Sequence, residues 1–237
     1  MRKGILWTVV GLWIVMGLFA CGGGGGDGPP SVATPIGTPV DLSVIKDFAE
    51  AKTQGNTMSF NLAGSSNKGA QFTGTYSVAI SAPTIISTPT GTQAVNVFEE
   101  NVTLTNTSTG ASSSGMTTYY YFPTGYLYNI VYDDGTISTP TSQTLLPASA
   151  KVGDSGDDMA ISNPDGSTGI STWRIDPGIN GDAKFVYVFT NWDNLHAVID
   201  TEEDAYTIKP DGSISAMSVG IYYPSLGITV TLSGNKN

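Results

Sequence analysis

Hydrophobic and polar residues alternate along most of the chain from residue 57 onward. Within residues 72–80, Phe, Gly, Tyr, Val and Ile at even positions alternate with Thr, Ser and Ala at odd positions. Within 126–132 the large residues fall at even positions, and within 185–189 the aromatic residues fall at odd positions. A period of two is typical of β-strands that bury one face. The pattern therefore predicts a fold built from half-buried strands.

The segment 183–237 has the most regular spacing of strand-like runs and turn signals. The strand-like runs lie at 183–190, 195–200, 204–209, 213–222 and 227–233. The turns between them, such as Thr201–Glu203 and Pro210–Gly212, are too short for crossover helices, so neighbouring strands must be antiparallel. We expect an all-β, mainly antiparallel fold: a curved meander sheet or open barrel, with a two-sheet β-sandwich as the alternative.

One segment, 41–52, has helical rather than strand spacing. Leu42, Ile45 and Phe48 fall near one helical face, Asp41 is a candidate N-cap, and Gly55 is a candidate terminator. A helix of this length is marginal alone and needs a sheet to pack on. The alternative for this region is a strand through 40–44.

The N-terminus has the pattern of a bacterial export signal. Residues 1–3 are Met-Arg-Lys, and 4–20 is an uncharged, largely apolar run that ends at Cys21. Leu18-Phe19-Ala20-Cys21 resembles the lipobox of bacterial lipoproteins. The resemblance implies that residues 1–20 are a signal peptide and that Cys21 carries an S-diacylglyceryl group and an N-acyl chain. The alternatives are an uncleaved anchor helix and an ordinary signal peptide with a chance cysteine.

The resemblance also implies an address in the cell envelope. In such lipoproteins an Asp after the cysteine commonly retains the protein in the inner membrane, so Gly22 implies the outer membrane if the cell has two. Residues 21–40, with the lipidated cysteine, are rich in Gly and Pro and predict a flexible tether. Residues 41–237 then form a single β-rich domain outside the cytoplasm.

The charge and the cysteine count exclude several functions. The chain has 10 basic and 20 acidic residues, and removal of Arg2 and Lys3 with the signal leaves 8 basic residues and a net charge of −12. Such a surface repels phosphate backbones and anionic lipids, so nucleic-acid binding and electrostatic membrane docking are not expected. The only cysteine is Cys21, so no internal disulfide can form.

No catalytic, metal or cofactor site is predicted. His196 is the only histidine, which cannot build a multi-histidine zinc site, and its position predicts a solvent-facing strand residue. Asp154, Asp157 and Asp158 lack the spacing of an EF-hand, so a solvated loop is expected and a calcium loop is the alternative. The acidic run 202–204 is interpreted as a charged turn.

Aromatic residues are the best candidates for ligand contact. If one face of the run Tyr-Tyr-Tyr-Phe at 119–122 is core, either Tyr119 and Tyr121 or Tyr120 and Phe122 face outward. The candidate ligand contacts are Tyr119, Tyr121, Trp173 and Trp192. Exposed rings of this kind bind sugars or protein partners. The alternative is that they form cross-strand pairs that only stabilise the sheet.

These observations favour a membrane-anchored, non-catalytic binding or structural domain with an envelope protein or a polysaccharide as its partner. The alternative is a carrier that holds an apolar molecule in a cavity under the curved sheet. An envelope hydrolase is a third hypothesis, and the absence of a nucleophile, base and metal-ligand pattern disfavours it.

Overall fold

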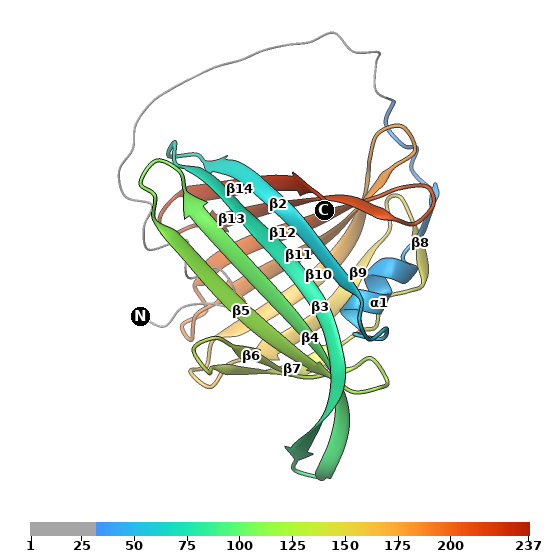
Figure 1. Cartoon of the computed structure of the whole chain (residues 1–237), viewed down its shortest axis with the longest axis vertical. Coiled ribbons are helices and arrows are strands. Elements are labelled where there is room, and N and C mark those ends of the chain that lie inside the picture. Colours follow the sequence, from blue (N-terminus) through green and yellow to red (C-terminus); the bar gives the residue numbers. More distant parts are fainter. Residues whose placement is uncertain (1–31) are drawn as a thin grey trace.

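The computed structural model describes residues 32–237, and its main body is a closed barrel of twelve antiparallel strands (Figure 1). Each strand of the barrel is hydrogen-bonded to two neighbours. The strands are β2 (Thr57–Ser66), β3 (Gln71–Thr88), β4 (Gly91–Asn106), β5 (Ser112–Tyr121), β6 (Leu127–Tyr132), β7 (Ile137–Gln143), β9 (Ser155–Ser162), β10 (Thr168–Pro177), β11 (Ala183–Trp192), β12 (Val198–Ile208), β13 (Ile214–Tyr223) and β14 (Ile228–Asn235).

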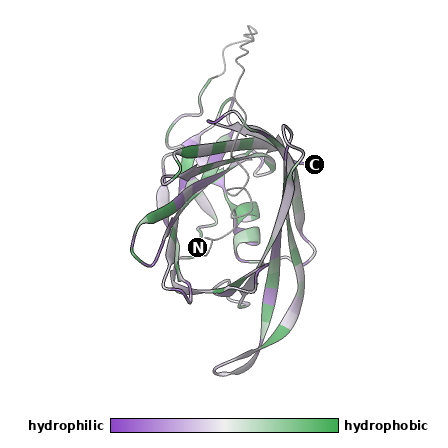
Figure 2. Ribbon diagram, turned by 90° about the vertical axis from the view of Figure 1, so that its left-hand side faces the viewer, coloured by the Kyte–Doolittle hydropathy of each residue, from purple (hydrophilic) through white to green (hydrophobic). Residues whose placement is uncertain are grey.

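Three short elements close one end of the barrel. Strands β1 (Pro39–Asp41) and β8 (Ser149–Lys151) form a separate two-stranded sheet, and helix α1 (Ser43–Ala49) follows β1 directly. Figure 2 shows the ring of strands with α1 lying within it. Because Ile45 and Phe48 are buried in the same core as the strands, α1 acts as a plug for this end.

Because hydrophobic and polar residues alternate along the strands, apolar side chains point into the barrel and polar side chains point outward. In β2 the buried apolar residues are Met58, Phe60 and Leu62, whereas Thr57 and Asn61 are exposed. Strands β3, β13 and β14 follow the same rule, with Thr, Ser or Gly on most outward positions. The hydrophobic core therefore lies inside the barrel, as it does where a sheet closes on itself.

Glycines allow the first and last long strands to meet. β14 pairs with β2 over four residue pairs, from Val230–Ser66 to Ser233–Ala63. A methyl group on Gly64 would lie 1.9 Å from the carbonyl oxygen of Thr231, and one on Gly234 would lie 1.9 Å from that of Asn61. No side chain fits at such distances, so the seam that closes the barrel depends on these two glycines.

The structure confirms the all-β, antiparallel fold and corrects several details. The sheet closes completely, where an open barrel, a curved sheet or a sandwich was expected. The predicted turn at Thr201–Glu203 is wrong, because β12 runs through it without interruption. The helix is shorter than expected and ends before Gly55; Leu42 occupies its cap position, while Asp41 Oδ1 accepts a hydrogen bond of 2.8 Å from the Ser43 N–H.

The end of the predicted tether is attached to the barrel. Ala33 bridges to Ile179, the Thr34 N–H donates to the Gly178 carbonyl at 3.0 Å, and the Gly37 N–H donates to the Val152 carbonyl at 2.8 Å. The flexible stretch predicted to continue to residue 40 is therefore wrong for 33–40. The predicted signal peptide, Cys21 and Gly22 lie outside the described residues.

No helix within residues 32–237 is long and apolar enough to cross a membrane.

The seam predicts the effect of one added methyl group. Gly64→Ala forces the β2 and β14 backbones apart, so we expect it to lower the free energy of unfolding by at least about 2 kcal/mol. Gly220→Ala is the matched control, because a methyl group there meets nothing within 4 Å, and Ala in a strand costs less entropy than Gly. Urea unfolding measures both; equal stability of Gly64→Ala and wild type would contradict the role of the seam.

Candidate functional site

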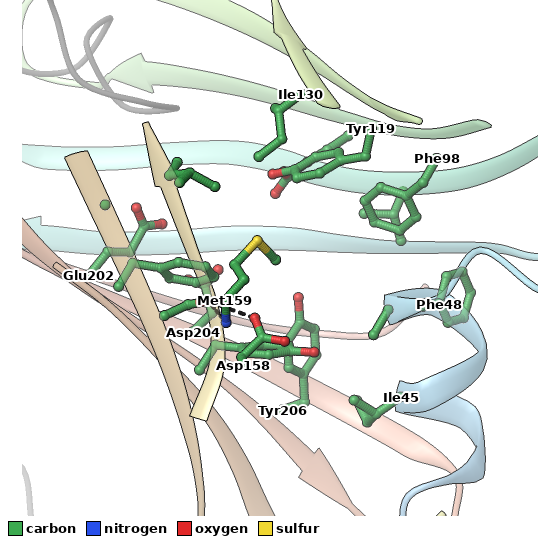
Figure 3. A pocket seen from close by; sticks show the side chains of 18 of the residues that line it. Ile45, Phe48, Phe98, Tyr119, Ile130, Asp158, Met159, Glu202, Asp204 and Tyr206 are labelled. Carbon is green, nitrogen blue, oxygen red and sulfur yellow. Dashed lines mark hydrogen bonds between the residues drawn. The ribbon is translucent and has the colours of Figure 1, made fainter. Parts of the chain in front are cut away.

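A cavity of about 130 Å³ lies inside the barrel between α1 and the walls of the strands (Figure 3). It extends from Ile45 and Phe48 of α1 to Gly169, near the start of β10, and Asn191, near the end of β11. Its lining combines aliphatic side chains, tyrosine and phenylalanine rings, and four carboxyl groups. Because apolar and acidic side chains line one concave space, this cavity is the candidate site.

Aromatic side chains form much of the wall. The ring of Tyr119 packs edge-on against Phe98 at 5.3 Å between centroids and lies nearly parallel to Tyr121 at 6.4 Å. On the other side the Tyr76 and Tyr206 hydroxyls lie 3.2 Å apart, within hydrogen-bond distance. Because these rings contact one another, they hold fixed positions around the cavity.

Glu100 faces this wall from β4. Its side chain is 5% exposed, and its Oε2 accepts a hydrogen bond of 3.0 Å from the Tyr119 hydroxyl. Burial raises the pKa of Glu100, although hydrogen bonds from Tyr76 and Tyr119 act in the opposite direction. Glu100 is thus a buried carboxyl held in place by phenol groups rather than by a cation.

Asp158 enters the cavity through a β-bulge in β9. Ser171 of β10 pairs with Met159 and Thr172 pairs with Asp157, which leaves Asp158 as the extra residue between them. As a result both Asp158 and Met159 line the cavity, although they are adjacent in the chain. The Ser171 hydroxyl donates to Asp158 Oδ2 at 2.6 Å, and burial raises the pKa of Asp158 to about 6.

Glu202 and Asp204 come from β12 and share its inner face. Each is 6% exposed, and the two side chains are hydrogen-bonded to each other. Burial raises the pKa of Asp204, and the nearby charge of Glu100 raises it further. Asp204 Oδ1 accepts no hydrogen bond from any described residue, which is costly for a buried carboxyl oxygen.

The described lining of the cavity is acidic and has no basic side chain. None of the described residues that line the cavity is Lys, Arg or His. Lys46 and Lys52 form ion pairs with Glu50, and Arg174 forms ion pairs with Asp176 and Glu203 on the outer face. Within 32–237, no three or more His, Cys, Asp or Glu side chains are grouped so that they could hold a metal ion.

The structure places the predicted aromatic residues differently from the expectation. Tyr119 and Tyr121 face the interior and line the cavity, so the alternative in which this pair faces outward is wrong. Trp173 is also inside, 8% exposed and stacked on Phe185 at 6.2 Å. Trp192 is half-buried near the end of β11, opposite Val198. The four residues do not form one exposed surface.

The other candidate residues are separated from one another. His196 is exposed, but in a turn with φ of 63° rather than in a strand. Asp154 Oδ2 accepts a hydrogen bond of 2.8 Å from the Lys151 N–H, Asp157 is exposed, and Asp158 faces the cavity. The segment is therefore neither a calcium loop nor the solvated loop that was expected.

The sequence interpretation missed the acidic residues of the cavity. Glu202 and Asp204 were assigned to a charged turn, whereas they occupy alternate inward positions of β12. The signal that identifies them is the continued period of two, since Asp200, Tyr206 and the two acids share one buried face. Glu100 follows the same rule in β4, two residues from Phe98.

No protein-family model, curated protein or solved structure matches this chain. The function must therefore be inferred from the cavity itself.

The raised pKa of Asp158 predicts an unusual dependence of stability on pH. Between its unfolded value near 3.8 and its folded value of about 6, the folded state holds a proton that the unfolded state has lost. The free energy of unfolding therefore falls as the pH rises through this window, by up to about 3 kcal/mol. Asp158→Asn should make this decline shallower by the contribution of Asp158, while Glu100 and Asp204 keep theirs, as measured by urea unfolding at pH 4 to 7.5.

The matched control is Asp157→Asn, which removes the same charge from the exposed neighbouring residue. It should keep the wild-type decline. A decline that is equally steep in Asp158→Asn would show that the buried carboxyl is not its cause.

Proposed function

We propose that this chain is a membrane-anchored, non-catalytic binding protein that holds a small, mainly apolar molecule inside its barrel. The observation that carries the proposal is the partly open cavity of about 130 Å³ with aromatic and aliphatic walls. Apolar cavities of about 150 Å³ are large enough to take up benzene. A ligand of about one ring fits this space.

The outer surface supports attachment through the N-terminus rather than through the barrel wall. Outward residues such as Thr57, Asn61 and Thr73 are polar and exposed, so they suit contact with water. Attachment would come from Cys21, whose lipobox-like context favours two or three acyl chains on one residue. Chains in that number anchor a protein durably, whereas a single chain binds reversibly.

Because Tyr119 and Tyr121 point inward, the proposed binding site lies inside the barrel rather than on its outer surface. An envelope protein or polysaccharide partner was to be recognised by these rings on an outer face. Because both line the cavity, they favour a small ligand that enters the barrel. The carrier hypothesis, stated first as an alternative, is the better supported of the two.

A hydrolase is the competing proposal, because carboxyls with a raised pKa are suited to general acid catalysis. Asp158 and Asp204 have this property. The Ser171 hydroxyl, however, donates a hydrogen bond to Asp158, and the described lining contains no histidine base. A cavity with room for one ring also does not admit a polysaccharide chain. These features favour binding without turnover.

A neutral single-ring molecule tests the cavity. Isothermal titration with 2-phenylethanol should give saturable binding with one molecule per chain. Met159→Trp fills the cavity and should abolish this binding. Met116→Trp is the matched control, since Met116 is 46% exposed and does not line the cavity, and it should bind as the wild type does. Unchanged binding by Met159→Trp, or none by the wild type, would contradict the proposal.

The lipid anchor is tested separately in the producing cell. Cys21→Ser removes the sulfur that accepts the diacylglyceryl group, so we expect no incorporation of labelled palmitate. The protein should leave the membrane fraction or accumulate as an unprocessed precursor. A processed Cys21→Ser protein that still sediments with membranes would contradict the anchor.

A further inference from the structure

The described residues that line the cavity include acidic groups but no Lys, Arg or His. Glu100, Asp158, Glu202 and Asp204 reach the cavity from three different strands, and each is at least nine-tenths buried. Proteins normally pair buried carboxylates with Lys or Arg, because an isolated buried charge is costly. Here the described lining holds no such residue.

Nearby basic residues are engaged elsewhere. Lys46 and Lys52 are bound to Glu50, and Lys46 also donates to the carbonyl of Leu146. Arg174 points outward from β10, where it donates two hydrogen bonds to Glu203, both of 3.1 Å. The positive charge that the cavity lacks is therefore not supplied by a shift of these side chains.

A second observation identifies the carboxyl oxygen that lacks a hydrogen-bond donor. Asp204 Oδ1 is buried within the cavity wall and accepts no hydrogen bond from the described residues. By contrast, Asp158 Oδ2 accepts from Ser171 and Glu100 Oε2 accepts from Tyr119. An N–H group from a ligand would satisfy the open oxygen of Asp204.

The aromatic rings add a third element. Tyr76, Tyr187 and Tyr206 line the cavity together with the carboxyls. The faces of such rings attract cations, and the attraction is strongest where water is excluded. Carboxyls and aromatic rings around one cavity form the kind of site that binds ammonium groups.

The two chemical characters lie at different ends of the cavity. Ile45, Phe48 and Phe98 lie near α1, whereas Glu202 and Asp204 lie farther from it (Figure 3). A ligand that satisfies both ends has an apolar group and a charged group. Its length is limited by the volume of about 130 Å³ to one ring or a short aliphatic group.

We infer that the ligand is a small organic cation, a protonated or quaternary amine on a single apolar or aromatic group. Its nitrogen lies against Asp204 and Glu202, and its apolar group lies toward Phe48 and Phe98. The inference rests on the proposed function, because it names the class of molecule that the cavity takes up. It explains both the open oxygen of Asp204 and the absence of a basic residue.

Three molecules of similar size and different charge test whether the cavity prefers a cation. Isothermal titration at pH 7 compares 2-phenylethylammonium, neutral 2-phenylethanol and anionic phenylacetate. The ammonium compound should bind at least tenfold more tightly than the alcohol, and phenylacetate at least tenfold more weakly than the alcohol.

Substitutions in β12 test which carboxyl groups cause the preference for the ammonium compound. Asp204→Asn should reduce the preference for the ammonium compound over the alcohol by about tenfold, and Glu202→Gln should reduce it in the same direction. Glu203→Gln is the matched control, because Glu203 lies between the two acids but points outward, and it should keep the full preference. Binding of 2-phenylethanol by each variant shows that its cavity is intact.

The outcomes separate the inference from the function on which it rests. Equal affinity for the ammonium compound and the alcohol, or a full preference in both Asp204→Asn and Glu202→Gln, would overturn the inference and leave the cavity as a site for neutral ligands. Absence of binding by all three molecules would overturn the proposed function itself.

Discussion

A closed sheet of twelve strands encloses more space than its own inward side chains fill. The width of a barrel grows with the number of strands, and eight strands already leave an interior just wide enough for side chains or one small ligand. In this chain the extra space is occupied in part by α1, which closes one end with Ile45 and Phe48. Large aromatic residues such as Phe60 and Phe185, both fully buried, fill much of the rest. The cavity is what remains.

The cavity is lined in part by acidic side chains that the fold does not need for its stability. An interior lined only by aliphatic residues would be more stable, because a buried carboxyl that is raised in pKa lowers stability near neutral pH. Glu100, Asp158 and Asp204 are three such groups on three strands, and they indicate that the interior serves to hold polar groups. Sites that lower stability in this manner are commonly those that function requires.

The secondary structure was largely predictable, because the period of two and the short turns depend only on local sequence. Closure of the barrel was not, because it depends on pairing between β2 and β14 and on the close approach at Gly64. Such contacts join residues far apart in the chain, and no local pattern reports them. A sequence with regular antiparallel strands fits an open sheet, a sandwich and a barrel equally well.

The candidate site was predictable only in part. Tyr119 and Tyr121 were identified, but aromatic residues occupy both faces of 119–122, so alternation alone does not show which face is buried. The sequence did not identify Asp158 as an inward residue, because a β-bulge breaks the alternation at that position. The sequence did not identify Glu202 and Asp204 as inward residues, because acidic residues are rarely buried. Three acidic residues in succession resemble a solvated turn.

The methionine methyl groups offer the most direct test that a ligand enters the barrel. Met58 and Met159 line the cavity, whereas Met116 is on the outer face and 46% exposed. NMR spectra of protein labelled with ¹³C at the methionine methyl groups should show saturable shifts of Met58 and Met159 on addition of 2-phenylethylammonium. The Met116 signal should stay unchanged. Shifts confined to Met116, or no shift of the two cavity methionines at saturation, would contradict a binding site inside the barrel.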